Sequence, residues 1–186
     1  MMCETRPVDR FQELQLLATF CRKGLRVEYD SPRIVELKRA NLRYRPDFVI
    51  RFQRISIIVE VDEDGHRGYP LDYEVNRVLS IWNAFDKRVI FLRVFIAKND
   101  KLSAEQTQIV YSAIMANRYG KCATPNAPHM IFVFYPSELV TNIRNSKRGG
   151  NLELIHYTPE ENTTTTVASI GGLKSVGIGL RNLGDI

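Results

Sequence analysis

The sequence predicts an α/β fold in which a mixed β-sheet is flanked by helices. Apolar residues recur at helical spacing over several segments, and short runs of β-branched and aromatic residues lie between those segments. The resulting order of strand, strand, helix, strand, helix, strand is typical of a mixed α/β domain. With 186 residues, 44% of them hydrophobic, the chain has enough apolar surface for one domain core.

The N-terminal part contains one helix and a pair of strands. Apolar side chains recur near helical spacing over residues 9–22, which predicts the first helix. Residues 47–52 and 55–62 are β-branched and aromatic runs, and they predict an antiparallel hairpin that turns at Gln53-Arg54. The polar residues 63–70, which include Gly and Pro, predict a loop.

The next two elements are a helix and a buried strand. The apolar stripe of residues 71–85 predicts a helix, and its members Trp82 and Phe85 belong to the core rather than to a base-stacking platform. Residues 88–96 are continuously apolar apart from their arginines, which predicts a central strand covered on both faces.

The C-terminal part repeats this alternation. Ser103 and Gln106 match a capping box that opens a helix ending near Gly120. Residues 130–135 predict another buried strand, and residues 152–157 predict an edge strand.

Composition divides the chain into a domain and a tail. Residues 1–157 carry the predicted elements, whereas residues 158–186 begin with a Thr run and are rich in Gly. We expect this low-complexity tail either to be disordered or to dock on the domain.

Charge and cysteine content narrow the functional classes. The formal net charge of +5 permits a polyanionic partner, and residues 37–54 hold six Lys or Arg but one acid, Asp47. The three Cys residues form no zinc-ligand or disulfide pattern. There is no membrane-spanning run and no signal peptide, so we expect an intracellular protein, cytoplasmic or nuclear.

Three carboxylates form the candidate site. If the hairpin turns at Gln53-Arg54, Asp47 lies directly opposite Glu60, with side chains about 5 Å apart on one side of the sheet. Asp62, two residues further along, shares that face. Like charges so close together raise a pKa and are tolerated where a cation lies between them. Mg²⁺, with Mn²⁺ as a substitute, suits a few carboxylates, waters and phosphate oxygens.

A purely structural role is the alternative for each of these residues. Asp47 by itself would be interpreted as a turn residue after Pro46. Glu60 argues against this interpretation, because it follows the apolar run 57–59, where a solvated charge is out of place.

Neighbouring residues suggest phosphodiester hydrolysis. A cation at this site could polarise a phosphate and lower the pKa of a water, and His66 could act as general base or acid unless it is simply solvent-exposed. Several cations could bind nucleic acid, namely Arg43, Arg45, Arg67, Arg77, Lys147 and Arg148. For Arg77 an ordinary surface ion pair with Glu74 is the simpler interpretation.

These residues resemble a known family. Arg45-Pro46-Asp47-Phe48, then IIVEVD at 57–62 with His66 in the next loop, resembles the PD-(D/E)XK nuclease superfamily. Within this superfamily, the residues resemble most the branch that contains very-short-patch repair endonucleases and EDxHD-type homing endonucleases. Tyr69, Glu74 and Arg77, with VIFLR at 89–93, resemble nuclease-like proteins of large DNA viruses.

The resemblance, over about a quarter of the chain, implies a restriction-endonuclease-like core. It implies a metal held by Asp47, Glu60 and the Val61 carbonyl, and a Glu on the first helix, for which Glu13 is the candidate. Asp62 stands where the superfamily usually has Lys; in the EDxHD-like branch an acid followed by His is usual, which points to His66.

The sequence therefore predicts a metal-dependent endonuclease acting on DNA, with Asp62 as ligand or water-orienting base. If it is viral, we expect it in the host cell or the virion. Two alternatives remain: an RNA endonuclease, or a non-catalytic nucleic-acid-binding or viral structural protein with a nuclease-like fold. A homodimer would suit cleavage of a duplex.

Overall fold

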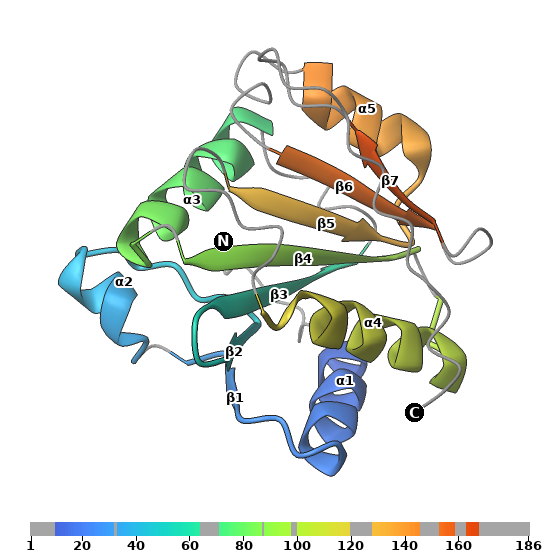
Figure 1. The fold of residues 1–186 in the computed structure, drawn as a ribbon, viewed down its shortest axis with the longest axis horizontal. Coiled ribbons are helices and arrows are strands. Elements are labelled where there is room, and N and C mark those ends of the chain that lie inside the picture. Colours follow the sequence, from blue (N-terminus) through green and yellow to red (C-terminus); the bar gives the residue numbers. More distant parts are fainter. Residues whose placement is uncertain are drawn as a thin grey trace, which may run out of the picture.

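Seven strands form one mixed sheet in sequence order, from β1 at one edge to β7 at the other (Figure 1). The computed structural model describes residues 10–31, 33–63, 71–86, 88–97, 100–119, 128–145, 153–158 and 163–167. The strands are β1 (Val27–Tyr29), β2 (Phe48–Arg51), β3 (Ser56–Glu63), β4 (Val89–Ile96), β5 (His129–Val133), β6 (Glu153–Thr158) and β7 (Thr163–Val167). The helices are α1 (Phe11–Arg22), α2 (Val35–Arg39), α3 (Leu71–Ala84), α4 (Ala104–Asn117) and α5 (Ser137–Asn145).

The sheet is antiparallel at both edges and parallel in its centre. β1, β2 and β3 pair antiparallel, β3 to β6 pair parallel, and β7 returns antiparallel to β6. Parallel neighbours need a crossover connection, and α3, α4 and α5 lie in the chain between the parallel strands. The predicted α/β class, a mixed sheet flanked by helices, is confirmed.

Helices cover both faces of the sheet. We call the side under α1 and α4, which contact each other, face A, and the side under α2, α3 and α5 face B (Figure 1). Ile57 and Val59 join the face A core, whereas Ile58 between them joins the face B core. This alternation follows from the strand period of two, and it determines on which face each polar residue of β3 lies.

Most predicted elements are confirmed with shifted ends. The hairpin is present in the predicted register, and the capping box forms, with Ser103 and Gln106 exchanging side-chain to backbone hydrogen bonds. Trp82 lies in the face B core as predicted. The helix expected to end near Gly120 already ends at Asn117. None of the described helices has both the length and the apolar character that a membrane crossing requires.

One expectation needs correction, and three short elements were not expected. Residues 153–158 do not form an edge strand, because β7, built from the Thr run, pairs with their outer side. At least this part of the predicted tail therefore belongs to the sheet. In addition, β1, α2 and α5 were not anticipated, since three to nine residues carry too little periodic pattern to identify an element.

Phe48 anchors the hairpin next to the candidate site. Its ring is fully buried, meets Phe20 edge-on with centroids 5.5 Å apart, and stacks on Tyr29 at 5.3 Å. We expect Phe48→Ala to lower the free energy of unfolding by about 3–5 kcal/mol in urea denaturation. Leu14→Ala on the exposed side of α1 is the control, with an expected change within about 0.5 kcal/mol. Equal effects of the two variants would contradict this packing.

Candidate active site

The β2–β3 register brings the first two predicted acids together. Phe48 pairs with Val59, so one further step along the hairpin places Asp47 opposite Glu60. Glu60 and Asp62 follow Ile58 in the strand alternation and therefore lie on face B. Glu60 and Asp62 thus share one face, as the strand alternation predicts.

Asp47 is fixed by the backbone of the neighbouring strand. Its Oδ2 accepts a hydrogen bond of 2.7 Å from the Val61 N–H. Burial is the main cause that raises the pKa of Asp47 to about 8, and the negative charge of Glu60 raises it further. The hydrogen bond from Val61 lowers this pKa but does not offset the other two effects.

Glu60 is buried and paired with one arginine. Its Oε1 accepts a hydrogen bond of 2.6 Å from Arg77 Nη2, and the residue is 4% exposed. Burial raises its pKa to about 7, although the positive charges of Arg77 and Arg93 act in the opposite direction. Two adjacent carboxyl groups thus bind protons more tightly than they would in water.

Asp62 has a different environment. Both of its oxygens accept hydrogen bonds of 2.5 Å from Arg93, one from Nε and one from Nη2, and Oδ2 also accepts one from the Tyr135 hydroxyl. Arg93 lies opposite Glu60 in the parallel β3–β4 ladder, and its Nη1 reaches Glu74 at 3.0 Å. Asp62 and Arg93 therefore form a buried, bidentate ion pair.

A backbone reversal brings Tyr135 to this pair. Phe134, just after β5, has a φ of 62°, and its side chain packs against the face A core. Tyr135 consequently lies in the face B core, together with Phe132 of β5. Without the reversal, strand alternation would direct residue 134 to face B and residue 135 away from it.

The three acids do not form a common ligand cluster. Across the described ranges, no group of three or more His, Cys, Asp or Glu side chains is arranged to hold a metal ion. The structure brings Asp47 and Glu60 together and directs Asp62 to Arg93 and Tyr135.

The Asp47 and Glu60 pair nevertheless fits a hard divalent cation. Within the described part of the chain, Asp47 Oδ1 and Glu60 Oε2 accept no hydrogen bond, so each carboxylate keeps one oxygen for a ligand. Hard cations prefer such oxygens, and a positive charge between them would offset the burial and the negative charge of Glu60, which together raise the pKa of Asp47.

Of the other predicted residues, some have contacts within the described structure and the rest lie outside the described ranges. Glu13 on α1 accepts a hydrogen bond of 2.8 Å from the Tyr29 hydroxyl, and its charge is near enough to contribute to the raised pKa of Asp47. Arg45 pairs with Asp30 at 2.7 Å. The residues that lie outside the described ranges are His66, Arg67, Tyr69, Lys147 and Arg148.

The expected ion pair of Glu74 and Arg77 is present, but it does not lie at the surface as predicted. The side chains are 15% and 12% exposed, and their shortest distance is 3.7 Å, longer than the 2.6 Å between Arg77 and Glu60. The helix face that carries them packs over the carboxylates of β3, which supply closer partners.

Sequence reasoning also missed Arg93 and Tyr135. For Arg93 a signal existed, because it is a charged residue in the middle of an apolar strand, and a buried charge requires a partner. For Tyr135 none existed, since its position depends on the reversed backbone at Phe134.

Comparisons with known proteins found no sequence relative but a distant similarity to a solved structure. No family model matches the chain, and no curated protein matches it. A solved structure described as a complex of the restriction endonuclease PspGI with substrate DNA is similar, with a TM-score of 0.38 and 15% sequence identity. The similarity covers 73% of this chain and 49% of that chain, about half of the neighbour's length. The predicted branch within the superfamily has no support from a family model or a curated relative.

The raised pKa values predict how stability changes with pH. In the unfolded chain both carboxyls have a pKa of about 4, whereas burial in the folded protein raises the pKa of Asp47 to about 8 and that of Glu60 to about 7. Between these values the folded state binds more protons, so the free energy of unfolding should fall as the pH rises from 5 to 8. Urea denaturation of chelator-treated protein measures this slope, and Asp47→Asn should flatten it. A slope that is the same in Asp47→Asn would contradict the raised pKa.

The Asp62 and Arg93 pair predicts strong coupling. Arg93→Met leaves a buried carboxylate without its cation and should cost about 3–5 kcal/mol of unfolding free energy. When Asp62→Leu is added, the fully buried carboxylate is removed and only the contact of Arg93 with Glu74 stays lost, so we expect the double variant to regain more than half of the loss. Urea denaturation of the four proteins gives the coupling energy. Additive effects of the two substitutions would show that the pair is not coupled.

Proposed function

We propose that this protein is a divalent-metal-dependent endonuclease that hydrolyses phosphodiester bonds in DNA. The observation that carries the proposal is the facing pair of Asp47 and Glu60, both with raised pKa values and each with one oxygen that accepts no hydrogen bond within the described residues. Two buried carboxylates side by side destabilise the folded state, so apolar residues at these positions would give a more stable protein if no ligand bound there.

A bound Mg²⁺ or Mn²⁺ would polarise the phosphate and lower the pKa of a water. Asp47, held by the Val61 N–H, and Glu60, held by Arg77, would be its ligands from the protein, and the Val61 carbonyl remains part of this proposed set. Two protein carboxylates are an ordinary number for Mg²⁺, which keeps waters and substrate oxygens as its other ligands.

Arg93 would supply the fixed positive charge at the site. The residue is 5% exposed and lies in register with Glu60, and its guanidinium is held by Asp62 and Glu74. Asp62, expected from sequence to be a ligand or a water-orienting base, would instead position this cation. By neutralising Asp62, Arg93 would keep that carboxylate from repelling a phosphate bound at Asp47 and Glu60, without reorganisation during the reaction.

Arg77 and His66 complete the proposed machinery. Arg77 neutralises Glu60 in the structure, and when a cation takes over that role its guanidinium would be released to bind a phosphate oxygen. His66 follows β3 in the chain, and we propose it for the proton transfer to or from water that hydrolysis requires.

A non-catalytic nucleic-acid-binding protein with the same fold is the second candidate. The pairing of Glu60 with Arg77 and of Asp62 with Arg93 favours it, since it neutralises two of the three acids within the protein. An RNA endonuclease with the same core would be distinguished by competing labelled RNA and DNA substrates.

A cleavage assay on supercoiled plasmid separates enzyme from binder. We expect nicking or linearisation with Mg²⁺ or Mn²⁺, and binding but little turnover with Ca²⁺. Removing a residue that only orients a metal ligand typically lowers the activity about 10–100-fold. Asp47 is a proposed ligand itself, so Asp47→Asn should lower the cleavage rate by at least about 100-fold.

Asp86→Asn is the matched control. It makes the same chemical change at an exposed position, where the φ of 51° is one that Asn adopts readily, so its rate should equal that of the wild type. DNA retardation without cleavage under every divalent ion would overturn the enzyme proposal and favour the binder.

A further inference from the structure

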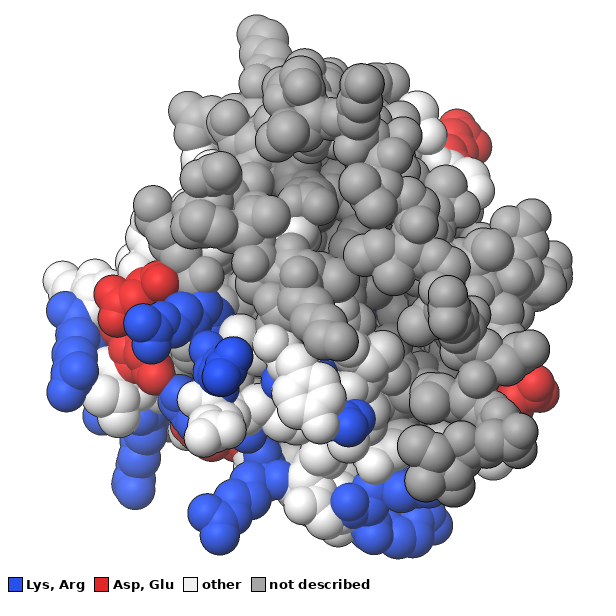
Figure 2. Space-filling model, in the orientation of Figure 1, with Lys and Arg blue, Asp and Glu red and all other residues white. Residues whose placement is uncertain are grey.

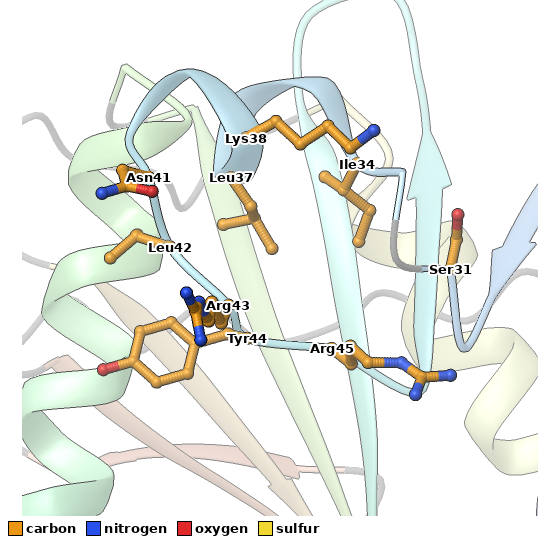
Figure 3. A pocket seen from close by; sticks show the side chains of 9 residues that line it. All are labelled: Ser31, Ile34, Leu37, Lys38, Asn41, Leu42, Arg43, Tyr44 and Arg45. Atoms are coloured by element: carbon orange, nitrogen blue, oxygen red, sulfur yellow. The ribbon is translucent and has the colours of Figure 1, made fainter.

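A cationic pocket lies beside the candidate active site. It has a volume of about 370 Å³ and is formed between α2 and the chain segment that leads into β2 (Figure 3). Its lining residues are Ser31, Ile34, Leu37, Lys38, Asn41, Leu42, Arg43, Tyr44 and Arg45. Three of the nine are cations and none is acidic; because Arg45 is paired with Asp30, Lys38 and Arg43 are the cations that can attract an anion.

The pocket has an apolar floor and a charged rim. Ile34 and Leu37 are buried, and with the half-buried Leu42 they point into the space under α2 in Figure 3. Lys38 lies on the α2 side of this floor, and Arg43 lies on the opposite side. Both are exposed, and within the described residues neither forms an ion pair, so both charges are available to a ligand.

The wall of the pocket is fixed by a well-defined turn. Asn41 has a φ of 54° and ends α2 in the left-handed conformation that Asn tolerates. The N–H groups of Asn41 and Leu42 donate to the carbonyls of Lys38 at 3.0 Å and Leu37 at 2.8 Å. This pairing is the Schellman arrangement, in which the apolar contact between Leu42 and Leu37 is typical.

Tyr44 connects the pocket to the carboxylates. Its ring centroid lies 5.9 Å from the guanidinium carbon of Arg77, whose Nη2 binds Glu60 at 2.6 Å. Along the chain, Tyr44 is also three residues before Asp47. A strand of nucleic acid whose scissile phosphate lies at Asp47 and Glu60 would therefore pass this pocket with a neighbouring nucleotide.

We propose that the pocket is a binding site for one nucleotide unit adjacent to the bond that is cleaved. Lys38 and Arg43, which lie on opposite sides of the pocket, bind the phosphates at its two ends, and the floor of Ile34, Leu37 and Leu42 takes its sugar and base. This inference rests on the proposed function for the identity of the strand. Figure 2 shows Lys and Arg side chains gathered on the side of the molecule where α2 lies, with a smaller group of Asp and Glu side chains among them; the excess of cations suits approach of a polyanion.

Binding of a fluorescein-labelled DNA duplex, measured by fluorescence anisotropy without divalent metal and over a range of salt, tests the site. Lys38→Ala with Arg43→Ala should weaken binding at least about 10-fold at moderate salt and reduce the slope of log affinity against log salt by about 1–2. The control is Arg33→Ala with Arg39→Ala, which removes the same charge from two exposed positions, one before α2 and one at its last residue, that do not line the pocket. Equal losses in the two double variants would overturn the site.

A competition arm tests the apolar floor. Thymidine 5′-monophosphate should displace the labelled DNA at lower concentration than inorganic phosphate does, because the floor adds apolar contact to the charge interaction. Equal competition by the two would overturn the assignment of the floor to sugar and base.

These outcomes are independent of catalysis. If the plasmid stays uncut while the Lys38 and Arg43 variant loses binding, the nuclease proposal fails and the nucleotide site stands. If the plasmid is cut and the variant binds like its control, the nucleotide site fails and the nuclease proposal stands. Unchanged thermal unfolding of the double variants confirms that loss of binding is not loss of fold.

Discussion

Burial of three acidic groups on one face of a hydrophobic sheet is the constraint on which the rest of this structure depends. Asp62 is fully buried, and an isolated carboxylate there would be strongly unfavourable. Arg93 neutralises Asp62 by a bidentate ion pair. Glu74 holds the other end of the Arg93 guanidinium, and the Tyr135 hydroxyl donates a further hydrogen bond to Asp62. The network links β3, β4, α3 and the turn after β5, so it also fixes how these elements lie around Glu60.

The same arrangement leaves the Asp47 and Glu60 pair incompletely neutralised. Arg77 contacts one oxygen of Glu60, and Asp47 has only a backbone N–H to offset its burial. The protein neutralises one acid completely and leaves two neighbouring carboxyl groups whose pKa values are raised mainly by burial, so their charged forms lack compensation. Such groups are typical of functional sites, where a ligand supplies the missing charge. Our proposal assigns that role to a divalent cation and the adjacent pocket to the DNA strand.

The local features of this site could be predicted from the sequence, whereas the long-range features could not. The turn at Gln53-Arg54 determines the β2–β3 register, so the opposition of Asp47 and Glu60 follows from a few residues. The partner of Asp62 is set by the parallel β3–β4 register, which depends on a crossover through α3 and has no local signal. Tyr135 depends on one left-handed residue, and the pocket wall depends on α2, five residues long, which is too short for periodicity to reveal.

Direct titration with Mn²⁺ by isothermal calorimetry tests the central claim, that Asp47 and Glu60 together hold one cation. The wild-type protein at about pH 8 should show one saturable site. Asp47→Asn and Glu60→Gln should each abolish it while leaving thermal unfolding cooperative. Absence of saturable binding, or a site that persists unchanged in both variants, would contradict the account.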